Sequence, residues 1–340
     1  MTADQAAPVE RMVRNGAVDL AVYESGTSNR DTVVLVHGWP DAHQLWDAVA
    51  ERLAIRFHVV TYDCRGHGGS SKPTAYGAYR VADYAADLLA VIDAVSPDKP
   101  VHLMAHDWGA LTAWDVVCDP QAQQRITAFL PMSGFNIDQL ALWVRARLVR
   151  PTPTGLVQVL AQMLCFAYQP VFALPGIPWL VRQLGRLGVS APLYRLLLRV
   201  SDGIATDRVT LAPDFGMDAA NGIRLYRANA LPVRLFRARR RPTAVPVRLI
   251  IPRRDLLIRR AALEDVGRIA PRLSMRVIAT GHWAPYSHPE LLVDVLCEFV
   301  DSLEPTTRSS ARAPEPVAPS PEAAGPVGDV AGRDMRSAGS

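Results

Sequence analysis

The sequence predicts an α/β fold in which a mostly parallel sheet is covered by helices on both faces. Short strand-like runs alternate with helical patterns, and the same alternation returns near the C-terminal end. The run at 32–36 is apolar throughout, which is typical of a strand buried on both faces. With 340 residues, 49% of them hydrophobic, the chain is long enough to bury a large core.

The N-terminal third is expected to begin with a hairpin. Residues 11–24 form two short strand patterns around Asn15-Gly16, a dipeptide that strongly favours a tight hairpin turn. The elements that follow are predicted as strands at 32–36, 57–62, 101–105 and 126–132, with helices at 80–95 and directly after residue 107.

From about Asn136 to Arg241 the pattern changes to helices only, with an apolar stretch interrupted by prolines. Strand patterns then return at 245–251 and 273–279. We interpret the helical block as a cap inserted over the carboxyl ends of the strands; a separate helical domain is the alternative. The expected divisions are a core in two parts (1–135 and 243–303), a cap (136–242) and a disordered tail (304–340) rich in Pro, Ala, Ser and Gly.

Composition limits the classes of partner. The formal net charge is +4, but no basic patch is interleaved with aromatic residues, so no nucleic-acid partner is expected. The four cysteines lack metal-ligand spacing, and no metal site is expected. No signal peptide is expected, and no uncharged run is expected to reach the roughly 20 residues needed to span a bilayer, which favours a cytoplasmic protein. The arginine-rich run from Arg234 to Arg241 is interpreted as a solvated hinge, and membrane-surface association and oligomeric state are left open.

The strongest site motif lies at the end of the strand at 101–105. A small residue, Ala105, then Asp107 and Gly109 have the spacing of a nucleophile elbow, a sharp strand-to-helix turn. Asp107 takes the central position, where Ser is commonest. A carboxylate is ionised at neutral pH and attacks an sp³ carbon directly, leaving an alkyl ester on the protein. The alternative interpretation of Asp107 is an ordinary helix N-cap.

Two polar residues are expected at the same edge of the sheet. His282 lies on the loop after the last strand and suits a general base on water, since its unperturbed pKa is about 6.5. Asp255 directly follows the preceding strand and is placed to accept the His282 N–H; an ordinary turn Asp is the alternative. Ser287 and Glu290 are predicted to form a capping box that starts the final helix.

The sequence HGWP follows the strand at 32–36. The backbone N–H groups of Trp39 and Trp108 are expected to form an oxyanion hole, and Trp39-Pro40 is a candidate cis peptide. The glycine-rich turn that begins at Asp63 lacks Walker A and dinucleotide-binding spacing, and it is interpreted as structural.

Over roughly residues 11–303 the chain resembles the α/β-hydrolase-fold epoxide hydrolases. HGWPD, RGHGGS, HDWG, Asp255 and GHW with SHPE match in order, and the order nucleophile, acid, His is that of this fold. The resemblance implies a helical cap with two tyrosines that bind the epoxide oxygen. Tyr168, in CFAYQP, and Tyr226, in LYRAN, match them, although Leu225 stands where the family usually has Trp.

The resemblance implies a cofactor-independent enzyme that opens an epoxide with water to a vicinal diol through an ester on Asp107, and the apolar cap suggests a small lipophilic epoxide as substrate. Opening an epoxide leaves an alkoxide, which needs a hydrogen bond or a proton. A phenol with a pKa of about 10 is protonated at neutral pH and is therefore able to act as that donor. A haloalkane dehalogenase with the same triad is an alternative, with Trp108 as halide donor; a hydrolase-fold protein that binds a small molecule without turnover is another. The resemblance extends to two-domain proteins in which such a hydrolase precedes a short-chain dehydrogenase, but the tail predicts no such domain and no reductase activity.

Overall fold

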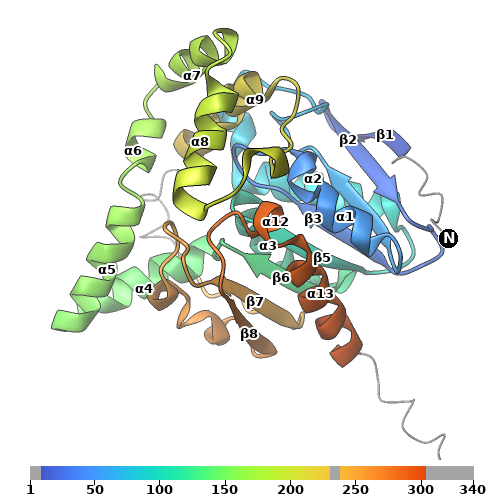
Figure 1. Ribbon diagram of the computed structural model, residues 1–340. Helices are drawn as coiled ribbons and strands as arrows, with labels where there is room; N and C mark the ends of the chain where they lie inside the picture. The colour runs from blue at the N-terminus through green and yellow to red at the C-terminus, as the bar shows by residue number, and fades with distance from the viewer. Residues whose placement is uncertain (1–8, 230–237, 304–340) are drawn as a thin grey trace, which may run out of the picture. The chain divides into compact units, whose positions relative to one another are not determined.

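An eight-stranded sheet lies at the centre of the fold (Figure 1). The structure is a computed structural model that describes residues 9–229 and 238–303. The strand order is β1-β2-β4-β3-β5-β6-β7-β8; β2 pairs antiparallel with β1 and β4, and the other pairs are parallel. This arrangement confirms the predicted mostly parallel α/β fold. The predicted tail and residues 234–237 of the arginine-rich run lie outside the described residues.

The strands lie close to their predicted positions. Gly16, with a φ of 60°, forms the hairpin turn predicted from Asn15-Gly16. The strands are β1 (Val9–Asn15), β2 (Val18–Ser25), β3 (Thr32–Val36), β4 (His58–Tyr62), β5 (Val101–His106), β6 (Ile126–Met132), β7 (Val247–Pro252) and β8 (Leu273–Ile278).

The sheet is buried on both faces, which explains its continuously apolar strands. In β3, Val34 and Val36 pack into the core cluster that contains the helices α2 and α3, and Val33 and Leu35 pack into the cluster of α1 and α13. Successive side chains of a strand point to opposite faces, so both sets must be apolar. The four helices are α1 (Asp47–Leu53), α2 (Val81–Val95), α3 (Trp108–Val117) and α13 (Pro289–Leu303).

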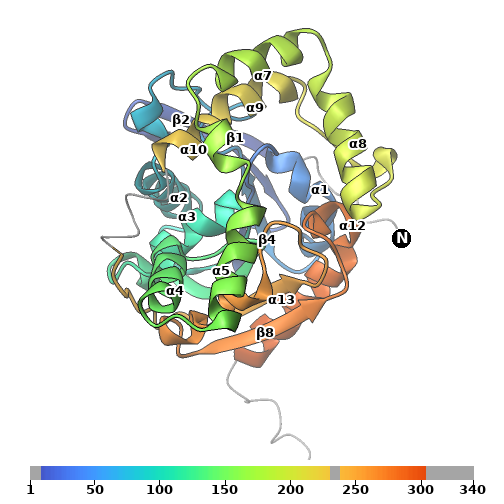
Figure 2. The same cartoon turned by 90° about the vertical axis from the view of Figure 1, so that its left-hand side faces the viewer.

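Between β6 and β7 the described chain is helical. The helices α5, α6 and α7 follow one another along the left edge of Figure 1, and Figure 2 turns this side toward the viewer. The boundaries of the cap stay a prediction. The helices are α4 (Ile137–Val149), α5 (Pro153–Cys165), α6 (Gln169–Phe172), α7 (Ile177–Arg186), α8 (Ser190–Asp202), α9 (Phe215–Gly222) and α10 (Arg224–Ala228).

The expectation that no uncharged run reaches the length needed to span a bilayer was wrong. Residues 151–181 contain no charged side chain, and the helical segment Pro153–Phe172 is long and apolar enough to cross a bilayer, with a mean hydropathy of 1.3 and 22% of it buried. The prolines divide this apolar stretch as the sequence suggested, because α6 and α7 each begin with a proline in the first turn. Pro153 and Pro170 each lie in the first turn of a helix, where the missing N–H costs nothing.

The predicted capping box of Ser287 and Glu290 was also wrong. A short helix, α12 (Ala284–Ser287), ends at Ser287, whose hydroxyl donates to the carbonyl of Trp283 at 3.3 Å. Helix α13 begins only at Pro289, and Glu290 forms an ion pair with Arg52 at 2.6 Å. Ser287 is therefore the last residue of α12 and does not act as the N-cap of α13.

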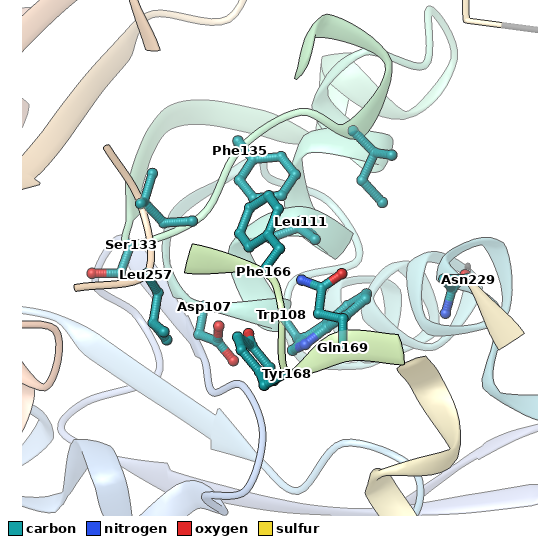
Figure 3. A pocket seen from close by; sticks show the side chains of 12 residues that line it. Asp107, Trp108, Leu111, Ser133, Phe135, Phe166, Tyr168, Gln169, Asn229 and Leu257 are labelled. Atoms are coloured by element: carbon teal, nitrogen blue, oxygen red, sulfur yellow. The ribbon is translucent and has the colours of Figure 1, made fainter. Parts of the chain in front are cut away.

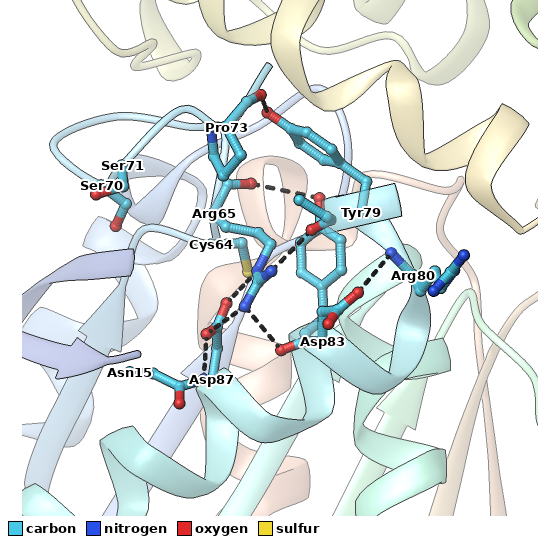
Figure 4. A network of polar contacts seen from close by, with 12 residues as sticks. Asn15, Cys64, Arg65, Ser70, Ser71, Pro73, Tyr79, Arg80, Asp83 and Asp87 are labelled. Atoms are coloured by element: carbon cyan, nitrogen blue, oxygen red, sulfur yellow. Dashed lines mark hydrogen bonds and ion pairs between the residues drawn. The ribbon is translucent and has the colours of Figure 1, made fainter. Parts of the chain in front are cut away.

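The glycine-rich turn after β4 is bonded within the fold, in agreement with its structural interpretation. Arg65 donates to both carboxylate oxygens of Asp87 on α2, at 2.6 and 2.7 Å, and to the carbonyls of Ala78 and Asp83 (Figure 4). Asn15 from the hairpin donates to Asp87 at 2.8 Å. Arg65 and Asp87 are buried, so this ion pair joins the hairpin, the turn and α2 out of contact with water.

The substitution Asp87→Ala is expected to lower the free energy of unfolding by about 3–5 kcal/mol, because it leaves the buried Arg65 charge without its carboxylate. Chemical denaturation followed by circular dichroism measures this change. Asp93→Ala on the same helix is the matched control. Asp93 is exposed and pairs with Arg125 at 3.2 Å, so its removal should cost about 1 kcal/mol or less. Equal losses in the two variants would contradict the role given to Asp87.

Candidate active site

Asp107 lies at the turn between β5 and α3 and has a φ of 51°, in the left-handed region that side chains rarely adopt. The turn packs tightly against the end of β3. A Cβ on Gly109 would lie 2.7 Å from the carbonyl oxygen of Val36 and closer still to that of His37. The geometry is therefore the strained strand-to-helix turn of a nucleophile elbow.

The Asp107 carboxylate is held by two backbone donors. The N–H of Trp39 donates to Oδ2 at 3.1 Å, and the N–H of Trp108 also hydrogen-bonds the carboxylate. The Trp39-Pro40 peptide bond is cis, as predicted. A Cβ on Gly38 would lie 2.5 Å from Oδ2, so only glycine lets the backbone come this close. The structure thus brings together the two N–H groups that the sequence assigned to an oxyanion hole.

His282 lies between two carboxylates. Its Nδ1 is 3.2 Å from both oxygens of Asp255, and its Nε2 is 3.8 Å from Oδ1 of Asp107, a little beyond hydrogen-bond distance. Asp255 follows β7 and also accepts the N–H groups of Leu257 and Ile258, at 2.8 and 3.1 Å. His282 and Asp255 are both buried, and the three side chains predicted to form a triad meet at the carboxyl edge of the sheet.

Burial and mutual attraction set the charges of these groups. Burial raises the pKa of Asp107 to about 6, against the opposing effects of His282 and the two backbone donors. Burial alone would lower the pKa of His282, but the carboxylates of Asp255 and Asp107 raise it to about 9. Burial would raise the pKa of Asp255, yet its contact with His282 brings it below the ordinary value. At neutral pH the site is therefore an imidazolium between two carboxylates.

Both predicted tyrosines lie close to Asp107. Tyr168 precedes α6 and Tyr226 lies in α10; their ring centroids are 5.8 Å apart, and Tyr226 meets Trp108 edge-on at 5.2 Å. Burial, followed by the Asp107 charge, raises the pKa of Tyr168 to about 12. Burial, followed by the neighbouring Tyr168 and Asp107, keeps the pKa of Tyr226 well above its ordinary value. Both phenols therefore keep their protons at neutral pH.

A cavity opens beside Asp107 and Tyr168 (Figure 3). Most of the side chains that surround it are apolar. They include Leu111, Phe135, Phe166 and Leu257, with Gln169 as a polar group. Residues of the core and of the helices between β6 and β7 both contribute, so the cavity presents mostly apolar side chains beside the Asp107 carboxylate.

The helix that carries Tyr226 is fixed to the core by Asn229, the last residue of the LYRAN motif. The Asn229 side chain accepts the N–H of Val81 at 2.9 Å and donates to the carbonyls of Tyr79 and Leu225, at 2.8 and 2.9 Å. The asparagine in this motif therefore holds Tyr226 in place.

Sequence reasoning missed the carboxylate of Asp41. This buried side chain accepts the hydroxyls of Tyr194 on α8 and Tyr286 on α12, both at 2.9 Å, and the indole N–H of Trp283 at 3.3 Å. It thereby joins the cap to the loop that carries His282. Asp41 is the last residue of the HGWPD motif, but the residues that bond its carboxylate lie far away in the sequence.

Two further residues support His282 and carried no sequence signal. Asp202, at the end of α8, accepts the N–H of Trp283 at 2.8 Å, and its charge also raises the pKa of His282. Burial lowers the pKa of His106 to about 3, so the ring is neutral, and its Nε2 lies 2.9 Å from the His282 carbonyl as a donor. Both contacts fix the His282 loop.

Within residues 9–229 and 238–303, no three His, Cys, Asp or Glu side chains are grouped so that they could hold a metal ion. The four cysteines are free thiols: Cys64, Cys118, Cys165 and Cys297. That the reaction needs no cofactor stays a prediction.

A family model described as the alpha/beta hydrolase fold matches residues 31–289. The chain belongs to the α/β-hydrolase fold family. This membership agrees with the strand order, the elbow at Asp107 and the positions of Asp255 and His282 after the last two strands.

Several relatives of this α/β-hydrolase carry epoxide hydrolase names. The chain is 38% identical over 290 residues to a Mycobacterium tuberculosis protein named "Probable oxidoreductase EphD"; the match covers 84% of this chain and 48% of the relative, so the chain spans about half of that protein's length. "Epoxide hydrolase A" of Mycobacterium tuberculosis is 39% identical over 110 residues, 32% of this chain and 34% of that one.

Solved structures show the same fold. The epoxide hydrolase of Bacillus megaterium, crystallised with an inhibitor, has a TM-score of 0.69 at 18% identity and covers 86% of this chain and 100% of its own. The resemblance to α/β-hydrolase-fold epoxide hydrolases that the motifs predicted is confirmed.

Proposed function

We propose that this α/β-hydrolase is an epoxide hydrolase that converts a lipophilic epoxide and water into a vicinal diol. The environment of Asp107 carries the proposal. Oδ2 of Asp107 accepts the Trp39 N–H, Oδ1 faces His282, and two protonated phenols from the cap lie nearby. The epoxide hydrolase names among the relatives support it.

In the first step, Oδ1 of Asp107 attacks a ring carbon, and the bond between that carbon and the ring oxygen breaks. The oxygen takes a proton from Tyr168 or Tyr226, which makes the strained ether a better leaving group. The product is a neutral ester of Asp107, with the released hydroxyl on the neighbouring carbon.

Ester formation changes the charge around His282. The Asp107 carboxylate is one of the groups that raise the pKa of His282, so its neutralisation lowers that pKa. The imidazolium then returns a proton to the phenolate and becomes a neutral base. Asp255 holds the ring through Nδ1 and leaves Nε2 free to accept a proton from water.

In the second step, the activated water attacks Cγ of Asp107. The developing negative charge on Oδ2 is stabilised by the N–H groups of Trp39 and Trp108. The acyl C–O bond breaks, His282 passes its proton to the departing oxygen, and the diol leaves. The proton of the new carboxyl group then moves to His282, which restores the starting charges.

The dehalogenase alternative needs an unoccupied N–H donor for halide. Both indoles near Asp107 have partners: Trp108 bonds the Tyr226 hydroxyl, and Nε1 of Trp39 donates to the carbonyl of Ala219 at 3.0 Å. Phenols, by contrast, supply the proton that an epoxide oxygen requires and a halide does not. The arrangement therefore favours epoxide opening.

A panel of epoxides with alkyl chains of increasing length, paired with bromoalkanes of the same chains, tests the proposal. We expect diol from epoxides, no halide release, and a loss of about 10²-fold or more in turnover by the Tyr168→Phe/Tyr226→Phe double variant. Halide release without diol formation would instead assign a dehalogenase. Saturable binding without turnover across the panel would assign a binding protein.

The pH dependence of kcat/KM should follow the Asp107 carboxyl of the free enzyme. Protonation removes the nucleophile, so kcat/KM is expected to fall about tenfold per pH unit below a pKa of about 6. The phenols do not titrate in this range. Initial rates with a water-soluble epoxide measure the profile. A midpoint near the ordinary value of 3.8 would contradict a buried nucleophile.

A further inference from the structure

The outer side of the cap exposes large apolar side chains to solvent. Of the 21 large apolar side chains that the described residues expose, 16 lie between residues 148 and 200. Such a concentration on one region marks an interaction surface, whereas scattered exposed residues do not. We define the outer cap face by its most regular members, which lie on α5, α6 and α7: Leu156, Val157, Leu160, Leu164, Val171 and Trp179.

Helix α5 is apolar on both sides. On its inner side Val159 is buried, and Phe166, which directly follows the helix, lines the cavity beside Asp107. Its outer side leaves Leu160 and Leu164 with 60 and 65% of their surface exposed. A surface helix ordinarily has a polar outer side, so the outer side of α5 is suited to an apolar environment.

Charge distinguishes among the occupants that an apolar face could have. Residues 139–201 contain seven arginines and no Asp or Glu. Arg145 and Arg150 lie at the end of α4 beside α5, and Arg186 and Arg199 lie on α7 and α8; all four are exposed. Within the described ranges, no ion pair joins any of them to a carboxylate.

We propose that the outer cap face docks onto the surface of an anionic lipid bilayer. Leucines with flanking arginines are typical of helices that lie in a membrane interface, and arginines are attracted to anionic headgroups. Trp179, 65% exposed, belongs to the residue type enriched at that depth. Docking does not require the proposed reaction.

The geometry favours a helix lying on the bilayer over one that crosses it. Helix α5 has 13 residues and is about 20 Å long, less than the roughly 30 Å of a hydrocarbon core. Phe166 and Tyr168, in the segment that would have to continue through the bilayer, line the cavity beside Asp107. A second copy of the chain is a poorer occupant, because a two-fold contact would bring arginines together with no carboxylate of this segment to pair with them.

Vesicle flotation with the full chain tests the proposal. The probes are vesicles of phosphatidylcholine mixed with phosphatidylglycerol, and vesicles of phosphatidylcholine alone. The wild type is expected to float with the anionic vesicles, less with the neutral ones, and less at high salt. The Leu160→Gln/Leu164→Gln/Trp179→Gln variant should lower the partition coefficient by about tenfold or more.

A matched control removes exposed apolar side chains away from the cap. The Met12→Gln/Ile55→Gln/Met275→Gln variant should partition like the wild type, since these side chains are exposed on other elements. Circular dichroism and thermal unfolding verify that both variants are folded, without reliance on enzymatic activity.

Three outcomes would overturn the proposal: no flotation of the wild type, an equal loss in the control variant, or unchanged binding by the cap variant. A wild-type dimer that the cap variant converts to a monomer, without vesicle binding, would assign the face to a second copy.

The Arg145→Glu/Arg150→Glu/Arg199→Glu variant should abolish the preference for anionic vesicles. If that preference persisted, the charge argument would be wrong.

Discussion

Replacing Asp107 with alanine is expected to lower diol formation by about 10⁴-fold or more, the scale on which loss of a nucleophile acts in triad hydrolases. The substitution removes the only atom that bonds to the substrate carbon in the proposed scheme. Steady-state diol production from an epoxide that the wild type accepts measures the loss.

Asp107→Asn separates chemistry from structure. Asparagine tolerates the positive φ at this position and retains an oxygen for the Trp39 N–H, so the elbow should keep its shape while the nucleophile is absent. The exposed variant Asp93→Ala should keep wild-type turnover. Wild-type rates in Asp107→Asn, shown by mass to retain the amide, would rule out nucleophilic attack by this residue.

His282→Gln is expected to lower multiple-turnover diol formation by about 10²–10⁴-fold, the usual contribution of a general base. Glutamine has a similar length but cannot take a proton from water, so the ester on Asp107 should accumulate. Intact-protein mass spectrometry should then show an increase equal to one epoxide molecule, and the modified peptide should contain Asp107.

The same adduct should be short-lived in the wild type, because there the base remains. If His282→Gln formed no adduct with every epoxide that the wild type converts, the two-step scheme would fail, since its first step does not use the imidazole as a base.

The parts of the site that the sequence predicted depend on local rules. The elbow at Asp107 could be predicted because a strand, a small residue and Gly109 occur within a few positions of one another. Asp255, His282 and Trp39 were predictable because each follows a strand, and parallel strands bring their carboxyl ends to one edge. Their closeness to Asp107 follows from topology alone.

Residues whose roles depend on distant contacts were not predictable in this way. Asp41 meets Tyr194 and Tyr286, which lie 153 and 245 positions away, and Asp202 reaches the His282 loop from the cap. No periodicity encodes how the cap lies on the core. The capping box was misread for a local reason, since α12 ends at Ser287 before the final helix begins.

The apolar stretch of the cap shows a different limit. Its prolines correctly predicted where the separate helices begin, but whether the outer side of these helices is covered depends on their packing, which the sequence does not encode. Only the exposed fractions of residues such as Leu160 and Leu164 show that this side has no partner among the described residues.

A single turnover in ¹⁸O-labelled water, with enzyme in excess over epoxide, tests the ester mechanism most directly. If Asp107 is the nucleophile, the diol takes its new oxygen from the carboxylate and is unlabelled, while the peptide that contains Asp107 gains one ¹⁸O. Direct attack of water on the epoxide would give the opposite result, a labelled diol and an unlabelled Asp107, and would contradict the proposed mechanism.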